Sequence, residues 1–159
     1  AHVRSSLGSR VPLILDGGPC THGIESTIVA VAGNRLRLLR PGSIALDALE
    51  AVAAVAVEPP AAAPAIEAPG QCESHYAPAK PLRLDACARR PGEWLIGFGP
   101  VAGDATLSAR GDLTEAAATL YDLLHAADAG TATAIAVAPV PHIGLGVAIN
   151  DRLRRAAHG

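Results

Sequence analysis

A run of prolines and alanines divides the chain and limits what it can fold into. Residues 58–69 read EPPAAAPAIEAP, in which the prolines are too closely spaced for a helix or an interior strand. The run also offers few large apolar side chains for a core. We therefore expect two folded parts, residues 1–57 and 81–159, joined by a linker over residues 58–80.

The composition favours α/β layers for both parts. Half of the 159 residues are hydrophobic, but only 3% are aromatic, so the core must be built from Ala, Val, Leu and Ile in close contact. The net charge of -2 supplies no basic field, so binding of nucleic acid through bulk electrostatic attraction is not indicated. We see no signal peptide or membrane span, and three cysteines without clustered spacing suit a reducing cytoplasm.

The beginning of the chain is unusual. There is no Met, and AHVRSSLGSR reads as the end of a helix closed by Gly8 rather than as the start of a protein. We expect the chain to be a C-terminal fragment of a longer protein.

Hydrophobic patterns predict three strands and a helix in the first part. Residues 11–18 (VPLILDGG) read as a buried strand that enters a loop, and residues 25–33 and 35–42 read as strands joined by a hairpin at Gly33–Asn34. A helix follows, with Ser43 as its N-cap.

The second part alternates strands and helices, which predicts a small open sheet, parallel and Rossmann-like, with helices packed on it. The helix over residues 112–130 is capped and amphipathic. The expected strands and the final helix are PLRLDA, EWLIGFG, TAIAVAPV and GLGVAINDRLRRAAH.

Two stretches in the first part carry chemically useful side chains. DGGPCTHGIESTI presents Ser26, Thr27 and backbone N–H groups, which suit a phosphate or carboxylate, although a plain connecting loop explains the same residues. Arg40, at a strand end before Pro41–Gly42, has the fork geometry for such an anion, or is simply solvated.

The linker ends in a denser motif, APGQCESHYAP. Prolines flank His75 and Tyr76, a pair able to bond phosphate or stack on a base, or alternatively to dock the linker on the first part. Cys72 and His75 have the spacing of half a metal site, but no second pair completes it.

The last helix opens with a Gly-x-Gly in HIGLGVAI. This pattern suits phosphate at a helix N-terminus, but it lacks the third glycine of the dinucleotide fingerprint, so a close strand-to-helix turn explains it as well. The arginines near the end of the helix complement its dipole without any ligand: Arg152, Arg154 and Arg155.

Five stretches of the chain, taken in order, resemble the two-domain threonylcarbamoyl-AMP synthases. They are LILDGGPCTHGIESTIV, LRPGSI, PGQCESHYAPAKPL, WLIGFGP and AIAVAPVPHIGLGVAINDRL. The resemblance implies the end of a YrdC-like twisted α/β catalytic domain, a motif-bearing linker and a small C-terminal α/β domain. It further implies condensation of ATP, L-threonine and bicarbonate into threonylcarbamoyl-AMP and pyrophosphate, with Mg²⁺ accompanying ATP. A tRNA-modifying transferase would use the product downstream to form N6-threonylcarbamoyladenosine.

The resemblance also implies roles for single residues. Ser26, with Thr27 beside it, would contact threonine or the bound intermediate, Arg40 would clamp phosphate or carboxylate, and His75 and Tyr76 would reach over the nucleotide from the linker. The chain departs from the family at Ala30, where Asp is common, and at residues 71–74, where Met, a basic residue and an aromatic are common.

The family's N-terminal half, with its Lys/Arg nucleotide-binding set, has no counterpart here, so we expect the fragment alone to be inactive. Two other classes remain open: a nucleotide-binding module without turnover, or a structural module supporting a separate catalytic half. A hydrolase using Ser26 is disfavoured because the sequence places no His–acid pair to activate it.

Overall fold

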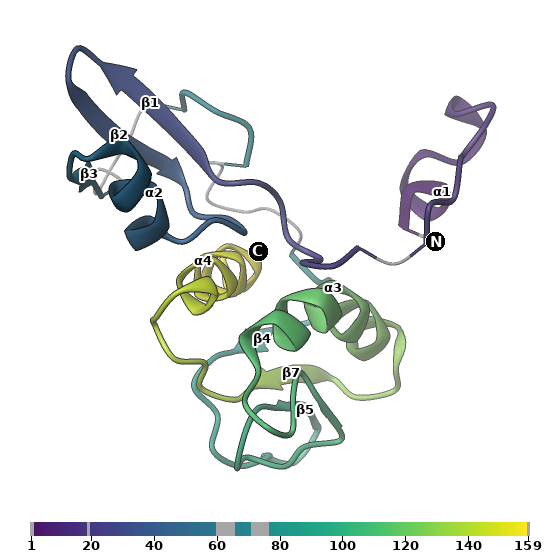
Figure 1. The fold of residues 1–159 in the computed structure, drawn as a ribbon. Coiled ribbons are helices and arrows are strands. Elements are labelled where there is room, and N and C mark those ends of the chain that lie inside the picture. The colour runs from purple at the N-terminus through teal and green to yellow at the C-terminus, as the bar shows by residue number, and fades with distance from the viewer. Residues whose placement is uncertain (1, 19, 60–65, 71–76, 159) are drawn as a thin grey trace.

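The computed structural model describes residues 2–18, 20–59, 66–70 and 77–158. They form two units, each built on its own sheet: residues 20–59 make up most of the N-terminal unit, and residues 77–158 make up the C-terminal unit. Figure 1 shows them one above the other, with the last helix between the two sheets. None of the helices in the described ranges is long and apolar enough to cross a membrane.

The N-terminal unit is a three-stranded sheet with one short helix. Its elements are β1 (Ile28–Ala32), β2 (Arg35–Arg40), α2 (Leu46–Ala53) and β3 (Val57–Glu58). β1 pairs antiparallel with β2 through the expected hairpin at Gly33–Asn34, with Ala32 opposite Arg35. β3 returns parallel to β2 on the other side, which needs the crossover that α2 supplies.

The stretch Val11–Gly18 is not a strand, which corrects the expectation from its apolar run. It follows α1 (His2–Leu7) and a short 3-10 turn (Gly8–Arg10) as irregular chain, and Leu13 and Leu15 are 71% and 86% exposed. A strand of this kind is stable only when neighbouring strands take up its backbone hydrogen bonds, and none of the described strands pairs with it. The helix end at Leu7 agrees with the sequence.

The N-cap of α2 also differs from the prediction. Ala45, not Ser43, occupies the N-cap position, and it makes no side-chain capping bond. Thr27 Oγ1 donates to the carbonyl of Ile44 at 2.8 Å and accepts from its N–H at 3.0 Å. Because these two bonds hold Ile44 outside the helix, α2 begins later than the hydroxyl of Ser43 would dictate.

The C-terminal unit is the parallel open sheet that the sequence predicts. The strands lie in the order β4-β7-β5-β6, and all pairings are parallel. The elements are β4 (Leu82–Arg83), β5 (Glu93–Gly97), β6 (Ala105–Thr106), α3 (Leu113–Ala129), β7 (Ala134–Val137) and α4 (Leu145–Ala157). Only β6 was not expected. α3 and α4 lie on the same face of the sheet (Figure 1).

Alternation along the strands divides the core of this unit between the two faces of the sheet. Ile96, Ile135 and Val137 are fully buried against the helices, whereas Leu95 and Ala136 point to the opposite face. α3 contributes a row of buried residues at helical spacing: Ala116, Ala117, Leu120, Leu124 and Ala127. Small and branched aliphatics therefore fill the core, as the composition indicates.

Both ends of α3 agree with the sequence. Asp112 is the N-cap, and its carboxylate accepts from the N–H groups of Thr114 and Glu115 at 2.8 and 2.9 Å. These bonds hold the pKa of Asp112 below its usual value. The helix ends at Ala129, with Gly130 as the C-cap.

Candidate functional site

Arg40 lies at the centre of the predicted site. Its side chain is at the end of β2, and the residue is only 8% exposed. Nε and Nη2 donate to the carbonyl oxygen of Ser26 at 3.1 and 3.0 Å, and Nη2 also reaches Ser26 Oγ at 3.4 Å. Nη1 donates to the carbonyl of Pro69 at 3.1 Å. The guanidinium thus joins the loop before β1 to the linker.

The turn after Arg40 packs directly on the same loop. A Cβ on Gly42 would overlap the backbone of Ser26 and Thr27, so this position requires glycine for the close approach. The hydroxyl of Thr27 is used by Ile44, as described above. Ser26, Thr27 and Arg40, which the family resemblance places in one site, therefore lie together in the structure.

The linker is held against the N-terminal unit just before the His–Tyr motif. Arg37 and Glu67 form a two-bond ion pair, with both N–O distances at 2.7 Å. Hydrogen bonding to Arg37 lowers the pKa of Glu67, and the same bond raises the pKa of Arg37. Together with the Arg40–Pro69 bond, this pair attaches residues 67–69 to β2.

The linker is held again just after the motif, this time on the C-terminal unit. The Lys80 ammonium donates to the carbonyls of Ala127 and Gly130 at 2.9 and 2.6 Å, and the Lys80 N–H donates to Asp128 at 3.1 Å. A cation at these last carbonyls complements the dipole of α3. His75 and Tyr76 lie outside the described residues, as does Cys72, so their predicted roles stay predictions.

An acidic residue that the sequence reading passed over connects the site to the C-terminal unit. Glu25, directly before Ser26, accepts a hydrogen bond from Arg152 Nε at 2.7 Å and faces the Tyr121 hydroxyl at 3.3 Å. Arg152 is 3% exposed and also donates to Asp151 at 2.7 Å. Burial lowers the pKa of Arg152, but the hydrogen bond and charge of Glu25 outweigh burial, and the pKa stands above its usual value.

One sequence signal could have identified Arg152. It falls on the apolar face of α4, at helical spacing from the buried Ile149 and Ala156 and beside Leu153. A charged residue in such a position is rarely buried unless it is paired. From the sequence, Arg152 is expected only to complement the helix dipole, and the structure adds a buried ion pair with Glu25.

The Gly-x-Gly at the start of α4 belongs to a close strand-to-helix turn. The buried Asn150 side chain donates to the carbonyls of Val140 and Gly146, both at 2.9 Å, and so ties the turn to the first part of α4. Gly144 is the N-cap. This arrangement accounts for the pattern without a phosphate.

Two hollows on the surface of the described residues were considered as ligand sites. A groove of about 410 Å³ lies between α2, the turn at Pro41–Gly42 and the start of α4, and it is mostly apolar, with Ile44, Ile143 and Val147 in its wall. Pro41 and Gly42, which directly follow Arg40, also line this groove.

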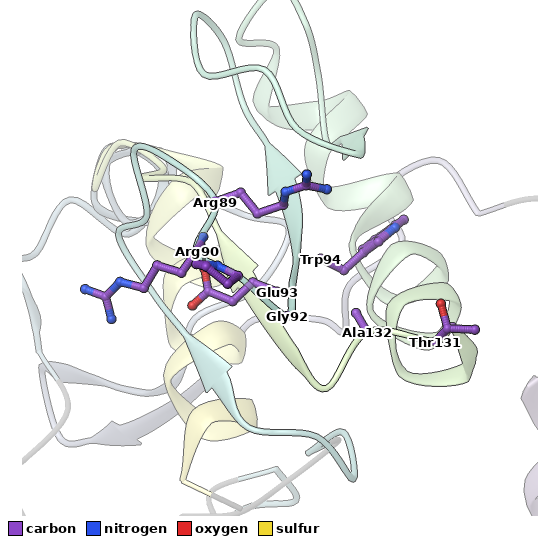
Figure 2. Close-up of a pocket in the computed structure, with 9 residues that line it drawn as sticks. Arg89, Arg90, Gly92, Glu93, Trp94, Thr131 and Ala132 are labelled. Carbon is purple, nitrogen blue, oxygen red and sulfur yellow. Dashed lines mark hydrogen bonds between the residues drawn. The ribbon is translucent and has the colours of Figure 1, made fainter.

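The second hollow, about 830 Å³ and wide open, lies between the loop before β5 and the end of α3. Figure 2 shows that the Arg89 and Arg90 guanidinium groups point in different directions there, away from any common centre. Arg89 is also paired with Asp104 at 2.8 Å. This hollow has no convergent set of polar groups, so we do not assign the site to it.

Comparisons with known proteins agree with this arrangement. The profile described as "Threonylcarbamoyl-AMP synthase, C-terminal domain" matches residues 44–158. This chain belongs to the threonylcarbamoyl-AMP synthase family. A second profile, described as "Telomere recombination", matches residues 1–42.

Members of the threonylcarbamoyl-AMP synthase family resemble the chain over nearly all of its length. It is 32% identical to the threonylcarbamoyl-AMP synthase of Bacillus subtilis over 99% of this chain and 52% of that protein. The chain therefore spans about half the length of this relative.

Two solved structures share the fold. The crystal structure of Pyrococcus abyssi Sua5 complexed with L-threonine matches with a TM-score of 0.82 at 24% identity, over 98% of this chain and 52% of that one. A variant of the P. abyssi protein, with a consecutive His and Tyr replaced by Ala, matches with a TM-score of 0.70 at 24% identity, over 89% of this chain and 47% of that one. The α/β class and the Rossmann-like open sheet expected from the sequence are confirmed.

Proposed function

We propose that the chain is part of an enzyme that makes L-threonylcarbamoyladenylate from ATP, L-threonine and bicarbonate, with release of pyrophosphate. The observation that carries the proposal is the meeting of three family motifs at one side chain. Arg40 of the LRPG motif holds Ser26 of the ESTIV motif and Pro69 of the linker motif. Family membership and the relatives named for this activity support the same reaction.

The reaction has two steps for the protein to assist. The threonine amine adds to the carbon of bicarbonate and water leaves, which gives a carbamate. A carbamate oxygen then attacks the α-phosphorus of ATP, and the bond to pyrophosphate breaks. Because negative charge builds up on phosphate oxygens, catalysis here depends on positioning and on hydrogen-bond donors that are already in place.

We assign Ser26 and Thr27 to the contact with threonine or the intermediate. Since the Thr27 hydroxyl is bonded to Ile44, its backbone N–H is the better donor of that residue. Arg40 has three of its nitrogens on Ser26 and Pro69, so its effect on a phosphate or carboxylate would come through its charge and its remaining N–H groups. It would also hold Ser26 in place.

We assign His75 and Tyr76 to the nucleotide, reaching over it from the linker. The anchors on either side, Arg40–Pro69 and Lys80 with the end of α3, fix where the intervening residues start and finish. This chain contains a single consecutive His–Tyr pair, and a His–Tyr pair was replaced in the solved P. abyssi variant.

Mg²⁺ would arrive with ATP and neutralise the phosphate groups. Within the described ranges, no group of three His, Cys, Asp or Glu side chains is placed to hold a metal ion. The described residues therefore do not fit a metal site of their own, and we derive no step through the ion.

We further propose that these 159 residues do not catalyse the reaction alone. The exposed apolar side chains of Leu13 and Leu15 indicate a segment that packs only when more of the fold is present. The product would pass to a transferase that modifies tRNA, and nothing in the charge of this chain calls for tRNA binding by itself.

The decisive experiment measures pyrophosphate release by the chain together with any upstream sequence that its gene encodes. ATP, threonine and bicarbonate are omitted one at a time, and the 159-residue chain is assayed in parallel. We expect release only from the longer protein and only with all three substrates. Release that continues without threonine would disprove the proposal, whereas nucleotide binding without any release would favour a non-catalytic binding module.

A further inference from the structure

The segment that carries Ser26 is held from two directions. On one side, Arg40 donates to the Ser26 carbonyl from the end of β2. On the other side, Glu25 is bound to Arg152, which lies 127 residues further along the chain on α4. We call Glu25, Tyr121, Asp151, Arg152 and Arg155 the junction cluster.

The residues before Ser26 are seated on the C-terminal unit. Ile24 packs against the hydrophobic core formed by the sheet and the helices of that unit. Gly23 has a φ of +60°, and a Cβ there would overlap the backbone of Ala117 and Ala118 in α3. The position of α3 and α4 therefore determines where residues 23–25 lie, and residues 23–25 in turn determine where Ser26 lies.

The junction cluster keeps its arginine in one orientation. Arg152 Nε faces Glu25, and Nη1 faces Asp151, which also accepts from Arg155 Nε at 3.1 Å. Arg152 Nη2 is buried and has no hydrogen-bond partner. A buried charge with an unsatisfied donor is a poor means of stabilising a fold, because apolar side chains of similar volume would do so at least as well.

We propose that Arg152 is a positioning residue, through which the C-terminal unit fixes the loop that presents Ser26 and Thr27 to the substrate. This inference rests on the proposed function for its chemistry, but its structural part does not. Glu25 connects this loop to α4 through Arg152, and Arg40 holds Ser26 against the end of β2. The C-terminal unit thereby affects the site without contacting the substrate. Figure 1 shows α4 on the side of its unit that faces α2 and β2.

The test uses the chain with any upstream sequence that its gene encodes. The variants are Arg152→Gln, Arg152→Lys, Glu25→Gln and the double variant Arg152→Gln/Glu25→Gln. Arg83→Gln is the matched control, because Arg83 forms a comparable two-bond pair with Glu93, at 2.6 and 2.7 Å, within the C-terminal unit. Each protein is assayed well below its own unfolding temperature.

For a positioning role we expect Arg152→Gln and Glu25→Gln each to raise KM for threonine by roughly tenfold or more, since small displacements of binding groups have effects of this order. The double variant should be no worse than the poorer single variant, because both changes break one interaction. Arg152→Lys keeps the charge, so its KM for threonine should lie between those of the unaltered protein and Arg152→Gln. Arg83→Gln should lower the unfolding temperature and leave KM unchanged.

Amide hydrogen exchange of residues 24–28 gives a second reading that needs no activity. Exchange should become faster in Arg152→Gln and Glu25→Gln but not in Arg83→Gln. If the unaltered protein shows no threonine-dependent release, the proposed function fails while this exchange pattern still supports the positioning role. If Arg152→Gln and Arg152→Lys lower the unfolding temperature but change neither KM nor exchange at residues 24–28, the inference is overturned.

Discussion

The Arg40 guanidinium lies inside the fold, although the residue stands at a strand end before Pro-Gly. Most arginines in such positions extend into water, and the sequence leaves that possibility open. The structure instead places its donors on the carbonyls of Ser26 and Pro69. Because those carbonyls belong to segments far apart in sequence, one side chain determines how two motifs meet.

Arg40→Lys should therefore destabilise the protein by about 2 kcal/mol, since a single ammonium cannot reach both carbonyls and charge-assisted hydrogen bonds are lost. Urea unfolding measures the change in the free energy of unfolding. Arg35→Lys, on the same strand, is the control: the Arg35 side chain is 72% exposed and its pair with Glu58 should matter little. Equal stability of the two variants would contradict the role given to Arg40.

The start of β5 is held by a carboxylate. Glu93 accepts from Arg83 Nε and Nη2 at 2.7 and 2.6 Å and from the Arg90 N–H at 2.7 Å. The hydrogen bond from Arg83 is the main reason that the pKa of Glu93 falls to about 2. This contact joins β4, the loop after it and β5.

Glu93→Gln should make stability less sensitive to acid. The ionised form of Glu93 is favoured in the folded state, so its contribution is present above its ordinary pKa of 4.5 and is lost as the pH falls toward about 2. Urea midpoints measured between about pH 5 and pH 2 should therefore converge for the unaltered protein and Glu93→Gln. Glu58→Gln serves as an exposed control, and midpoints that stay a constant distance apart would count against this assignment.

At the scale of the whole molecule, the two units are connected at several points besides the covalent chain. Residues 23–25 dock on α3 and α4, and the linker is bonded to β2 before the His–Tyr motif and to the end of α3 after it. We expect the units to unfold together for this reason.

Gly23→Ala should split this shared unfolding transition into two, one for each unit. Gly33→Ala is the matched control: its φ of +62° is equally unfavourable for Ala, but a Cβ there would meet no atom within 4 Å. We expect a loss of about 1 kcal/mol for Gly33→Ala from backbone strain and about 2 kcal/mol more for Gly23→Ala from overlap with α3. Calorimetry measures both, and a single, equally shifted transition in the two variants would refute the docking role.

Local sequence signals were sufficient for much of the fold. Asp112 and Gly130 mark the ends of α3, Gly33–Asn34 marks the hairpin, and alternating strands and helices predict the parallel sheet, because each depends on residues close in sequence. The grouping of Ser26, Thr27 and Arg40 came from the family resemblance, and the structure brings them together. Their roles toward ligands, like those of His75 and Tyr76, stay predictions.

Other features depend on contacts between residues that are distant in sequence. Val11–Gly18 has the composition of a strand, but a strand exists only with partners to bond its backbone. The partners of Arg40 and the burial of Arg152 against Glu25 depend on how two separate units pack, and no local propensity encodes a contact across 127 residues. Sequence patterns indicate the family and most of the elements, whereas packing determines which charged groups are buried together and which segments they hold in place.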